Sequence, residues 1–304
     1  MSTLSNEHVF YAFEPGLEPA IRIAQGEELT LETKDCFSNQ LNSPSDEIDA
    51  LDWDRINPAT GPVYIEGVTA GDMVRVRLLQ VRPTGYSTMA CIPGEGALAD
   101  HVKTSETTII ENCGDTIVLP TQRGPLTIAA RPMIGVIGLA PAQGSVPNGT
   151  PGTHGGNMDC TIIGEGATLY LKAGADGGLF GCGDLHSVMG DGEVLVCGAE
   201  TPGLVTIAAE VIDEPRLPTP FVETDKLYAV IASAGSIDAA TKLATDLMFS
   251  FLTDVVRLST NDAGRLMSLV GNLKFCQVVD PQVTVRFEFP KSVLQRLGYG
   301  GIDS

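Results

Sequence analysis

The sequence predicts a mainly β protein with an α+β C-terminal part: a β-sandwich-like core plus a smaller domain carrying one long amphipathic helix. Thirty-four glycines and 19 prolines divide most of the chain into short apolar runs, and such punctuation at intervals of roughly 8 to 15 residues is typical of strands joined by turns. After Pro220 the apolar residues follow a helical period. We therefore expect a β-rich domain carrying the functional site at residues 1–215, an extended connector at 215–220, and an α+β part at 221–304 that packs against the first domain. A loop within a continuous domain is an equally good interpretation of residues 215–220.

Three apolar segments of the first 215 residues have the pattern of strands. In residues 28–33 (ELTLET) and 74–81 (VRVRLLQV) apolar side chains alternate with polar ones, which predicts strands buried on one face. Residues 133–139 (MIGVIGL) are apolar on both faces and lie between two prolines. This pattern indicates a strand that is buried on both sides at the centre of the domain.

The C-terminal part is expected to alternate strand and helix. We predict strands at residues 226–232 and 282–289 from their composition and alternation. Between them, a long helix at 237–258 starts at the N-cap Ser236, and a shorter helix runs from Ser259 to a stop at Gly271. The expected buried face of the long helix is Ala240, Leu243, Leu247, Phe251 and Val255.

Charge and composition exclude several classes of partner. The 304 residues have a formal net charge of −19, so phosphate backbones and anionic membrane surfaces are repelled. The first residues lack the basic and apolar regions of a signal peptide, and no later stretch approaches the roughly 18 apolar residues of a membrane span. Seven cysteines without CxxC spacing fit a reducing compartment. We expect a cytoplasmic protein without nucleic-acid or membrane partners.

A glycine-rich segment, residues 156–193, concentrates the residues that could perform chemistry. It contains Asp159, Asp184, His186, Asp191 and Glu193, although the whole chain has only four histidines. Carboxylates with one imidazole suit Zn²⁺ or a similar divalent ion, and an Asp-x-His pair on a strand places both side chains on one face. The second acidic pair could supply further ligands or a general base. Turns in which each Asp bonds its own backbone are an equally good interpretation.

Further candidates lie outside that acidic set. His154 could bind metal, polarise a carbonyl or shuttle a proton, and Asn157 could donate to a substrate carbonyl; a structural hydrogen bond and a left-handed turn are the alternatives. Asp35, at the end of a predicted strand, is the upstream ligand candidate or a turn cap. The cysteines near these acids (Cys36, Cys160 and Cys182) are expected to pack, because no cysteine-protease or G-x-S-x-G neighbourhood accompanies them.

Several stretches together resemble the acetamidase/formamidase family. They are HVFYAFEPGLEPAIRIAQGEELTLETKDCF, NPATGPVYIEGVTAGDMVRVRL, RPMIGVIGLAP, PGTHGGNMD, LFGCGDLHSVMGDGE and VVDPQVTVRF. The combination of HGGNMD with GDLHSVMGDGE is far more specific than either half. Glu95 in IPGEGALAD departs from the apolar or aromatic residue of the family, which implies an altered pocket wall and an altered substrate preference.

The resemblance implies hydrolysis of a small aliphatic amide, formamide-like or acetamide-like, to a carboxylate and ammonia by a cytoplasmic homo-oligomer (dimer or higher). It also implies a divalent metal, with Zn as the best match and Ca as a second or structural ion. Carried over by position, the metal residues are Asp35, Asp159, Asp184 and His186, and Asp191 and Glu193 match the following acidic pair, in which one carboxylate acts as the base. His154 and Asn157 complete the expected catalytic residues, because their side chains could stabilise the oxyanion of the carbonyl. The alternatives are a non-catalytic β-rich protein with a structural Ca-type site, and a hydrolase of a cyclic amide or urea-like compound.

Overall fold

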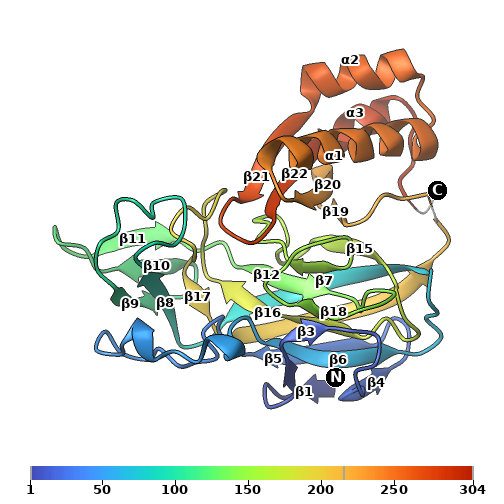
Figure 1. Ribbon diagram of the computed structural model, residues 1–304. Helices are drawn as coiled ribbons and strands as arrows, with labels where there is room; N and C mark the ends of the chain where they lie inside the picture. The colour runs from blue at the N-terminus through green and yellow to red at the C-terminus, as the bar shows by residue number, and fades with distance from the viewer. Residues whose placement is uncertain (1, 215, 303–304) are drawn as a thin grey trace.

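Two β-sheets that share one apolar core, with helices over one end of the first sheet, make up the fold (Figure 1). The computed structural model describes residues 2–214 and 216–302. Pro215, the first residue of the predicted connector, lies outside the described residues. The expectation of a mainly β protein with an α+β C-terminal part is confirmed.

The first sheet contains nine strands among the described residues and runs from the N-terminus to the C-terminal part. Its order is β1 (Ser2–Leu4), β5 (Glu28–Thr33), β18 (Gly203–Ile212), β7 (Met73–Pro83), β15 (Thr168–Lys172), β19 (Phe221–Glu223), β20 (Leu227–Ala234), β22 (Val283–Pro290) and β21 (Asn272–Gln277). The strands predicted at 28–33, 74–81, 226–232 and 282–289 are all present.

The second sheet has eleven described strands and carries most of the glycine-rich segment. Its main order is β11 (Leu126–Ala129), β10 (Thr116–Leu119), β9 (Glu106–Asn112), β8 (Tyr86–Cys91), β17 (Glu200–Thr201), β16 (Phe180–His186), β12 (Met133–Gly138) and β14 (Gly155–Asn157). A branch is formed by β6 (Ala59–Ile65), which pairs with β16, β2 (Val9–Phe10) and β4 (Ile21–Ile23). A separate antiparallel pair joins β3 (Ala12–Phe13) to β13 (Val146–Pro147).

Apolar alternation explains how the sheets pack together. Val74, Val76 and Leu78 of β7 are buried in the core that both sheets share, because side chains two residues apart lie on the same face of a strand. All six residues of β12 are buried between β14 and β16, as its two-sided apolar pattern predicts. This rigid strand lies directly beneath the acidic segment described below.

Helices cover one face of the C-terminal strands, above the rest of the molecule in Figure 1. They are α1 (Ile237–Ser250), the π-helical turn η3 (Phe251–Val255), α2 (Thr260–Val270) and α3 (Lys291–Arg296). Two short 3₁₀ turns, η1 (Ile48–Ala50) and η2 (Trp53–Arg55), lie between β5 and β6 in the chain. Ser236 and Ser259 cap α1 and α2 as predicted, each accepting a backbone N–H with its side chain.

The long helix differs from its prediction in two details. It ends before residue 258, because Arg257 has a left-handed backbone (φ 67°) that no helix continues. Its buried face contains Ala244 and Met248, whereas Leu243 is 39% exposed. The small alanine side chains allow the helix to approach the sheet closely, and Leu243 lies on the outer side.

The predicted division at residues 215–221 falls within a continuous sheet. Strand β19 pairs with β15 on one side and β20 on the other, so the C-terminal strands extend the first sheet. The division into domains 1–215 and 221–304 stays a prediction. Among the described residues, no helix combines the length and apolar character needed to cross a lipid bilayer.

Candidate active site

Two groups of buried side chains that could hold a metal ion meet near the ends of strands from both sheets. One group is Asp159, His186 and Glu193, and the other is Cys36, Asp184 and Glu200; within each group, one ligand atom from every residue lies within 4.8 Å of the others. The residues come from β16, the start of β17, the segments after β14 and β5, and the loop from β16 to β17. Segments distant in sequence therefore build one centre.

His186 and Glu200 connect the two groups. The two residues are direct partners across the antiparallel strands β16 and β17, a position in which facing side chains meet. Nε2 of His186 lies 2.9 Å from Oε1 of Glu200, 3.3 Å from Oε1 of Glu193 and 3.9 Å from Oδ1 of Asp159. Neither ring nitrogen has an aligned hydrogen-bond partner within residues 2–214 and 216–302. Carboxylates of both groups thus converge on one ring nitrogen, and Glu200 and Glu193 lie within ion-pair distance of it.

Three of these acids have an unusual backbone conformation. Asp159, Asp184 and Glu193 have positive φ angles of 43°, 55° and 48°. A left-handed conformation is uncommon for residues other than glycine and is retained where the surrounding structure enforces it, often at functional sites. The side chains are therefore directed toward one another at a cost in backbone energy.

Two glycines make room for the cluster. A Cβ atom on Gly135 of β12 would overlap both Oδ1 of Asp159 and Oδ2 of Asp184, and one on Gly198 would overlap the His186 ring. Neither glycine has a positive φ, so space rather than backbone conformation requires glycine here. The strand β12 thus packs directly against both carboxylates.

The electrostatics of the centre are dominated by mutual repulsion of acids. Burial, followed by the charges of Glu193 and Asp184, raises the pKa of Asp159 well above its usual value. Burial and Glu200 likewise raise the pKa of Asp184. Burial disfavours the charged imidazole of His186, yet Glu200 and Asp184 outweigh it and raise its pKa. One imidazole cannot balance so many carboxylates.

A divalent cation would resolve this imbalance, and the residues present fit one. Both oxygens of Asp159, Oδ1 of Asp184 and Oε2 of Glu200 are buried without a hydrogen-bond partner in the described part of the chain. Buried polar groups are normally paired, and buried charges are paired or coordinate metals. Oxygen, imidazole and thiol donors together match Zn²⁺ better than Ca²⁺, which takes oxygen ligands.

A small cavity opens onto the centre. Its volume is about 170 Å³, and its wall includes Asn157, Asp184, Glu193, Glu200 and Asp280 as polar groups. The remaining wall residues include Phe37, Trp53, Ile92 and Glu95. Pockets for drug-sized ligands typically have 300–1,000 Å³. The cavity is thus suited to a molecule of a few heavy atoms.

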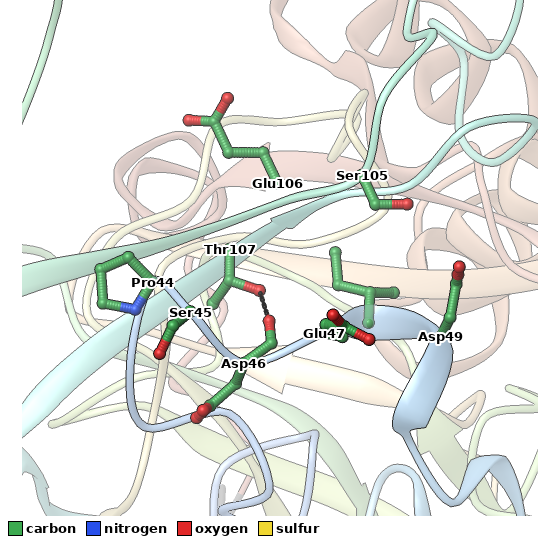
Figure 2. Close-up of a pocket in the computed structure, with 9 residues that line it drawn as sticks. Pro44, Ser45, Asp46, Glu47, Asp49, Ser105, Glu106 and Thr107 are labelled. Atoms are coloured by element: carbon green, nitrogen blue, oxygen red, sulfur yellow. Dashed lines mark hydrogen bonds between the residues drawn. The ribbon is translucent and has the colours of Figure 1, made fainter.

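Another acidic pocket, shown in Figure 2, does not have this arrangement. It has a volume of about 400 Å³ and is lined by residues 44–49 and 105–107. Figure 2 shows the carboxylates of Asp46, Asp49 and Glu106 pointing in different directions, while Thr107 bonds the backbone oxygen of Asp46. Separate, solvated carboxylates of this kind do not form a ligand set, so the larger volume does not mark the reactive site.

The structure gives three of the predicted site residues partners outside the two groups. Asp191 is bound by both terminal nitrogens of Arg286, at 2.9 and 2.7 Å, and its side chain is 38% exposed. The ring of His154 packs edge-on against Phe13 and lines a different pocket; burial lowers its pKa to about 4, so it is neutral. Oδ1 of Asp35 accepts the N–H of Asn39 at 2.6 Å, which is the turn-capping alternative.

Asp159, Asp184, His186, Glu193 and Asn157 are brought together as expected from their clustering in sequence. Asn157 donates its amide N–H to Oδ2 of Asp280 at 3.0 Å, and its own oxygen has no hydrogen-bond partner among the described residues. These five residues of the predicted set remain candidates for the functional site.

Sequence reasoning missed Cys36 as a ligand candidate, Glu200 and Asp280. Cys36 was expected only to pack, as Cys160 and Cys182 do in the shared core, but its sulfur lies within the second group. Glu200 stands alone between small residues in GAET, and only the β16–β17 register reveals its contact with His186. Asp280 lies in the turn from β21 to β22, which Figure 1 shows reaching from the helical end toward β16. The only signal in the sequence for Glu200 and Asp280 is that each is an isolated acidic residue among uncharged neighbours.

Comparison with known proteins places this centre in context. Residues 2–149 and 145–227 match the model of the Acetamidase/Formamidase family. The crystal structure of an acetamidase from Bacillus halodurans is 39% identical, with a TM-score of 0.94 over 98% of this chain and 100% of the other. A predicted acetamidase/formamidase from Thermoanaerobacter tengcongensis is 40% identical, with a TM-score of 0.93 over 98% of both chains.

A formamidase from Methylophilus methylotrophus is 25% identical over 261 residues. That alignment includes 66% of this chain and 63% of the formamidase. The alignment thus covers less than two thirds of this curated relative's length.

Proposed function

The chain belongs to the acetamidase/formamidase family, and from this premise we propose that it hydrolyses a small aliphatic amide to a carboxylate and ammonia with a divalent metal ion. The observation that carries the proposal is the buried convergence of Asp159, His186 and Glu193 beside Cys36, Asp184 and Glu200. Such a set, in which several desolvated acids share one imidazole, is costly to fold unless it performs a task.

The metal residues of the proposal differ from those expected from sequence. Asp159, His186 and Glu193 would hold one ion, and Cys36, Asp184 and Glu200 would hold a second or share the first. The ion would act as a Lewis acid that polarises the amide carbonyl and lowers the pKa of a water molecule toward neutrality. Cys36 takes the place that sequence reasoning gave to Asp35, and its thiol favours Zn over Ca.

The protein's own side chains would bind and orient the amide. The unpartnered oxygen of Asn157 is an acceptor, so it can receive a hydrogen bond from the NH₂ group of the substrate. Its N–H is already donated to Asp280, which fixes the orientation of the Asn157 amide. This assignment replaces the donor role that the sequence suggested for Asn157.

Asp280 would transfer the proton. It lines the cavity beside the proposed ligand Glu193, and burial raises the pKa of its carboxyl group well above the ordinary value. An acid whose pKa lies closer to neutral pH can take a proton from the attacking water and then give it to the leaving nitrogen. The C–N bond breaks as the nitrogen leaves as ammonia, and the acyl carbon retains the oxygen from water as a carboxylate.

The thiol and the cavity beside the centre favour this proposal over a structural Ca-type site. Ca²⁺ takes oxygen ligands and does not require a cavity beside it, whereas Cys36 and a 170 Å³ pocket belong to this centre. A cyclic amide or urea-like substrate would use the same groups and differ only in the fit to the wall that includes Trp53 and Glu95.

A substrate series tests the proposal. We expect ammonia release from formamide and acetamide, with kcat/KM falling about 10-fold or more once the acyl chain exceeds the cavity, because a misfitting methylene costs roughly 1–3 kcal/mol. Propionamide and butyramide extend the series, and urea and a γ-lactam represent the alternatives. Ammonia release from urea alone, or opening of the lactam ring to the amino acid alone, would favour a hydrolase of a urea-like compound or cyclic amide. No hydrolysis of any compound by the metal-loaded protein would favour the non-catalytic site.

A further inference from the structure

Arg286 forms a buried junction between the C-terminal part and the loop of the candidate site. It lies on β22, is only 2% exposed, and is among the largest fully buried side chains. Its terminal nitrogens donate to the two oxygens of Asp191 at 2.9 and 2.7 Å, and its Nε donates to Oε1 of Glu288 at 2.7 Å. One nitrogen also donates to the backbone oxygen of Phe275 at 2.7 Å.

Asp191 links this junction to the segments that carry Asp159 and Glu193. It precedes Glu193 by two residues in the loop between β16 and β17. Its Oδ1 also accepts the hydroxyl of Thr161 at 2.7 Å, and Thr161 follows Asp159 by two residues. Gly192, between Asp191 and Glu193, donates its N–H to the backbone oxygen of Cys276 at 2.8 Å. The segments that carry Asp159 and Glu193 are thus held to the end of β21.

We propose that Arg286 is a positioning residue for the metal centre: through Asp191 it holds Glu193 and Asp159 in the arrangement that faces His186. The inference rests on the proposed function for its kinetic consequence, but the geometric role does not depend on which reaction occurs. Asp191 therefore acts as the anchor of the loop rather than as the base or ligand that its spacing suggested.

The chemistry of the junction requires arginine. A guanidinium is planar and presents parallel N–H groups that match the two oxygens of a carboxylate. Arg286 donates from its two terminal nitrogens to Asp191 and from its Nε to Glu288. Lysine would keep the charge but could not hold both oxygens of Asp191 in a fixed orientation. The positive φ of Glu193 needs such enforcement, because the conformation is not intrinsically favoured.

The test compares Asp191→Asn with Glu288→Gln in the full-length chain. Both substitutions remove one carboxylate from Arg286, but only Asp191 belongs to the loop of the site. We expect Asp191→Asn and Arg286→Lys to weaken Zn²⁺ affinity by roughly 10- to 100-fold, as substitutions of groups that orient metal ligands do. Zn²⁺ binding is measured by competition with a chromophoric chelator, and kcat on acetamide should fall with KM nearly unchanged. Glu288→Gln should stay within about threefold of the unmodified protein.

A second variant and a second readout keep the test decisive if a substitution impairs folding. Thr161→Val removes only the hydroxyl that binds Asp191 and should weaken Zn²⁺ binding several-fold. With four histidines in the chain, the ring ¹⁵N signals of His186 can be assigned by NMR; they should shift in Asp191→Asn but not in Glu288→Gln. Equal losses in both variants, or an unmoved His186 signal, would overturn the positioning role. Failure of the proposed hydrolysis would appear separately, as absent ammonia release by the unmodified protein.

Discussion

Replacing Asp159 with asparagine is expected to remove the bound metal ion and to lower amide turnover by about a thousandfold, on the order of 4 kcal/mol of transition-state stabilisation. Asp159 is fully buried, and both of its carboxylate oxygens lack a hydrogen-bond partner among the described residues. An amide oxygen in the same place binds a cation far less well, because it carries no net charge. Metal content of the purified variant and the rate of ammonia release measure the two effects.

The same substitution should not weaken the fold. The pKa of Asp159 is raised because burial and the charges of Glu193 and Asp184 disfavour its ionised form, so a neutral side chain relieves repulsion in the metal-free protein. Chemical denaturation of the metal-free forms should show Asp159→Asn at least as stable as the unmodified chain. The exposed Asp115 provides a matched Asp→Asn control. Retention of both metal and turnover by the Asp159 variant would show that the ligand assignment is wrong.

Adding one methyl group at Gly135 is expected to have nearly as large an effect. The new Cβ would overlap the carboxylates of Asp159 and Asp184 together, and β12 cannot move away because all its residues are buried. Overpacking of this kind costs about 1–3 kcal/mol, and a shift of about 1 Å in a reacting group can cost a hundredfold in rate. We expect Gly135→Ala to lose about a hundredfold in kcat although no functional group is removed.

Gly190→Ala is the control for this prediction. Gly190 lies in the loop that carries Glu193, yet a Cβ there meets nothing within 4 Å and its φ is not positive. Its turnover and metal content should be close to those of the unmodified protein. If Gly135→Ala were as active as the unmodified protein, the close packing of β12 would not determine the spacing of the two carboxylates.

The secondary structure was largely predictable because its signals are local. Alternation identified β5 and β7, and the hydroxyl N-caps Ser236 and Ser259 identified the starts of α1 and α2. The orientation of α1 was less predictable, since a sequence does not show whether leucines or smaller alanines lie against the sheet. The prediction placed Leu243 on the buried face, but alanines lie there and Leu243 is exposed.

The candidate site was predictable only where its residues are close in sequence. Asp184 and His186 are two residues apart on one strand, so their common face followed from strand geometry. Glu200 depends on the register between β16 and β17, which no local pattern specifies. Asp191 and Glu193 have equivalent spacing, and only a partner 95 residues away, Arg286, distinguishes the anchored acid from the one in the centre.

Metal titration of the stripped protein tests the central claim most directly. The full-length chain is freed of metal with a chelator, Zn²⁺ is added in steps, and ammonia release from formamide and acetamide is followed with bound metal measured in parallel. We predict negligible turnover without metal and a rate that rises in proportion to the ion bound at the Asp159–His186–Glu193 group. Undiminished turnover by the stripped protein, or full metal loading without ammonia release, would contradict the account.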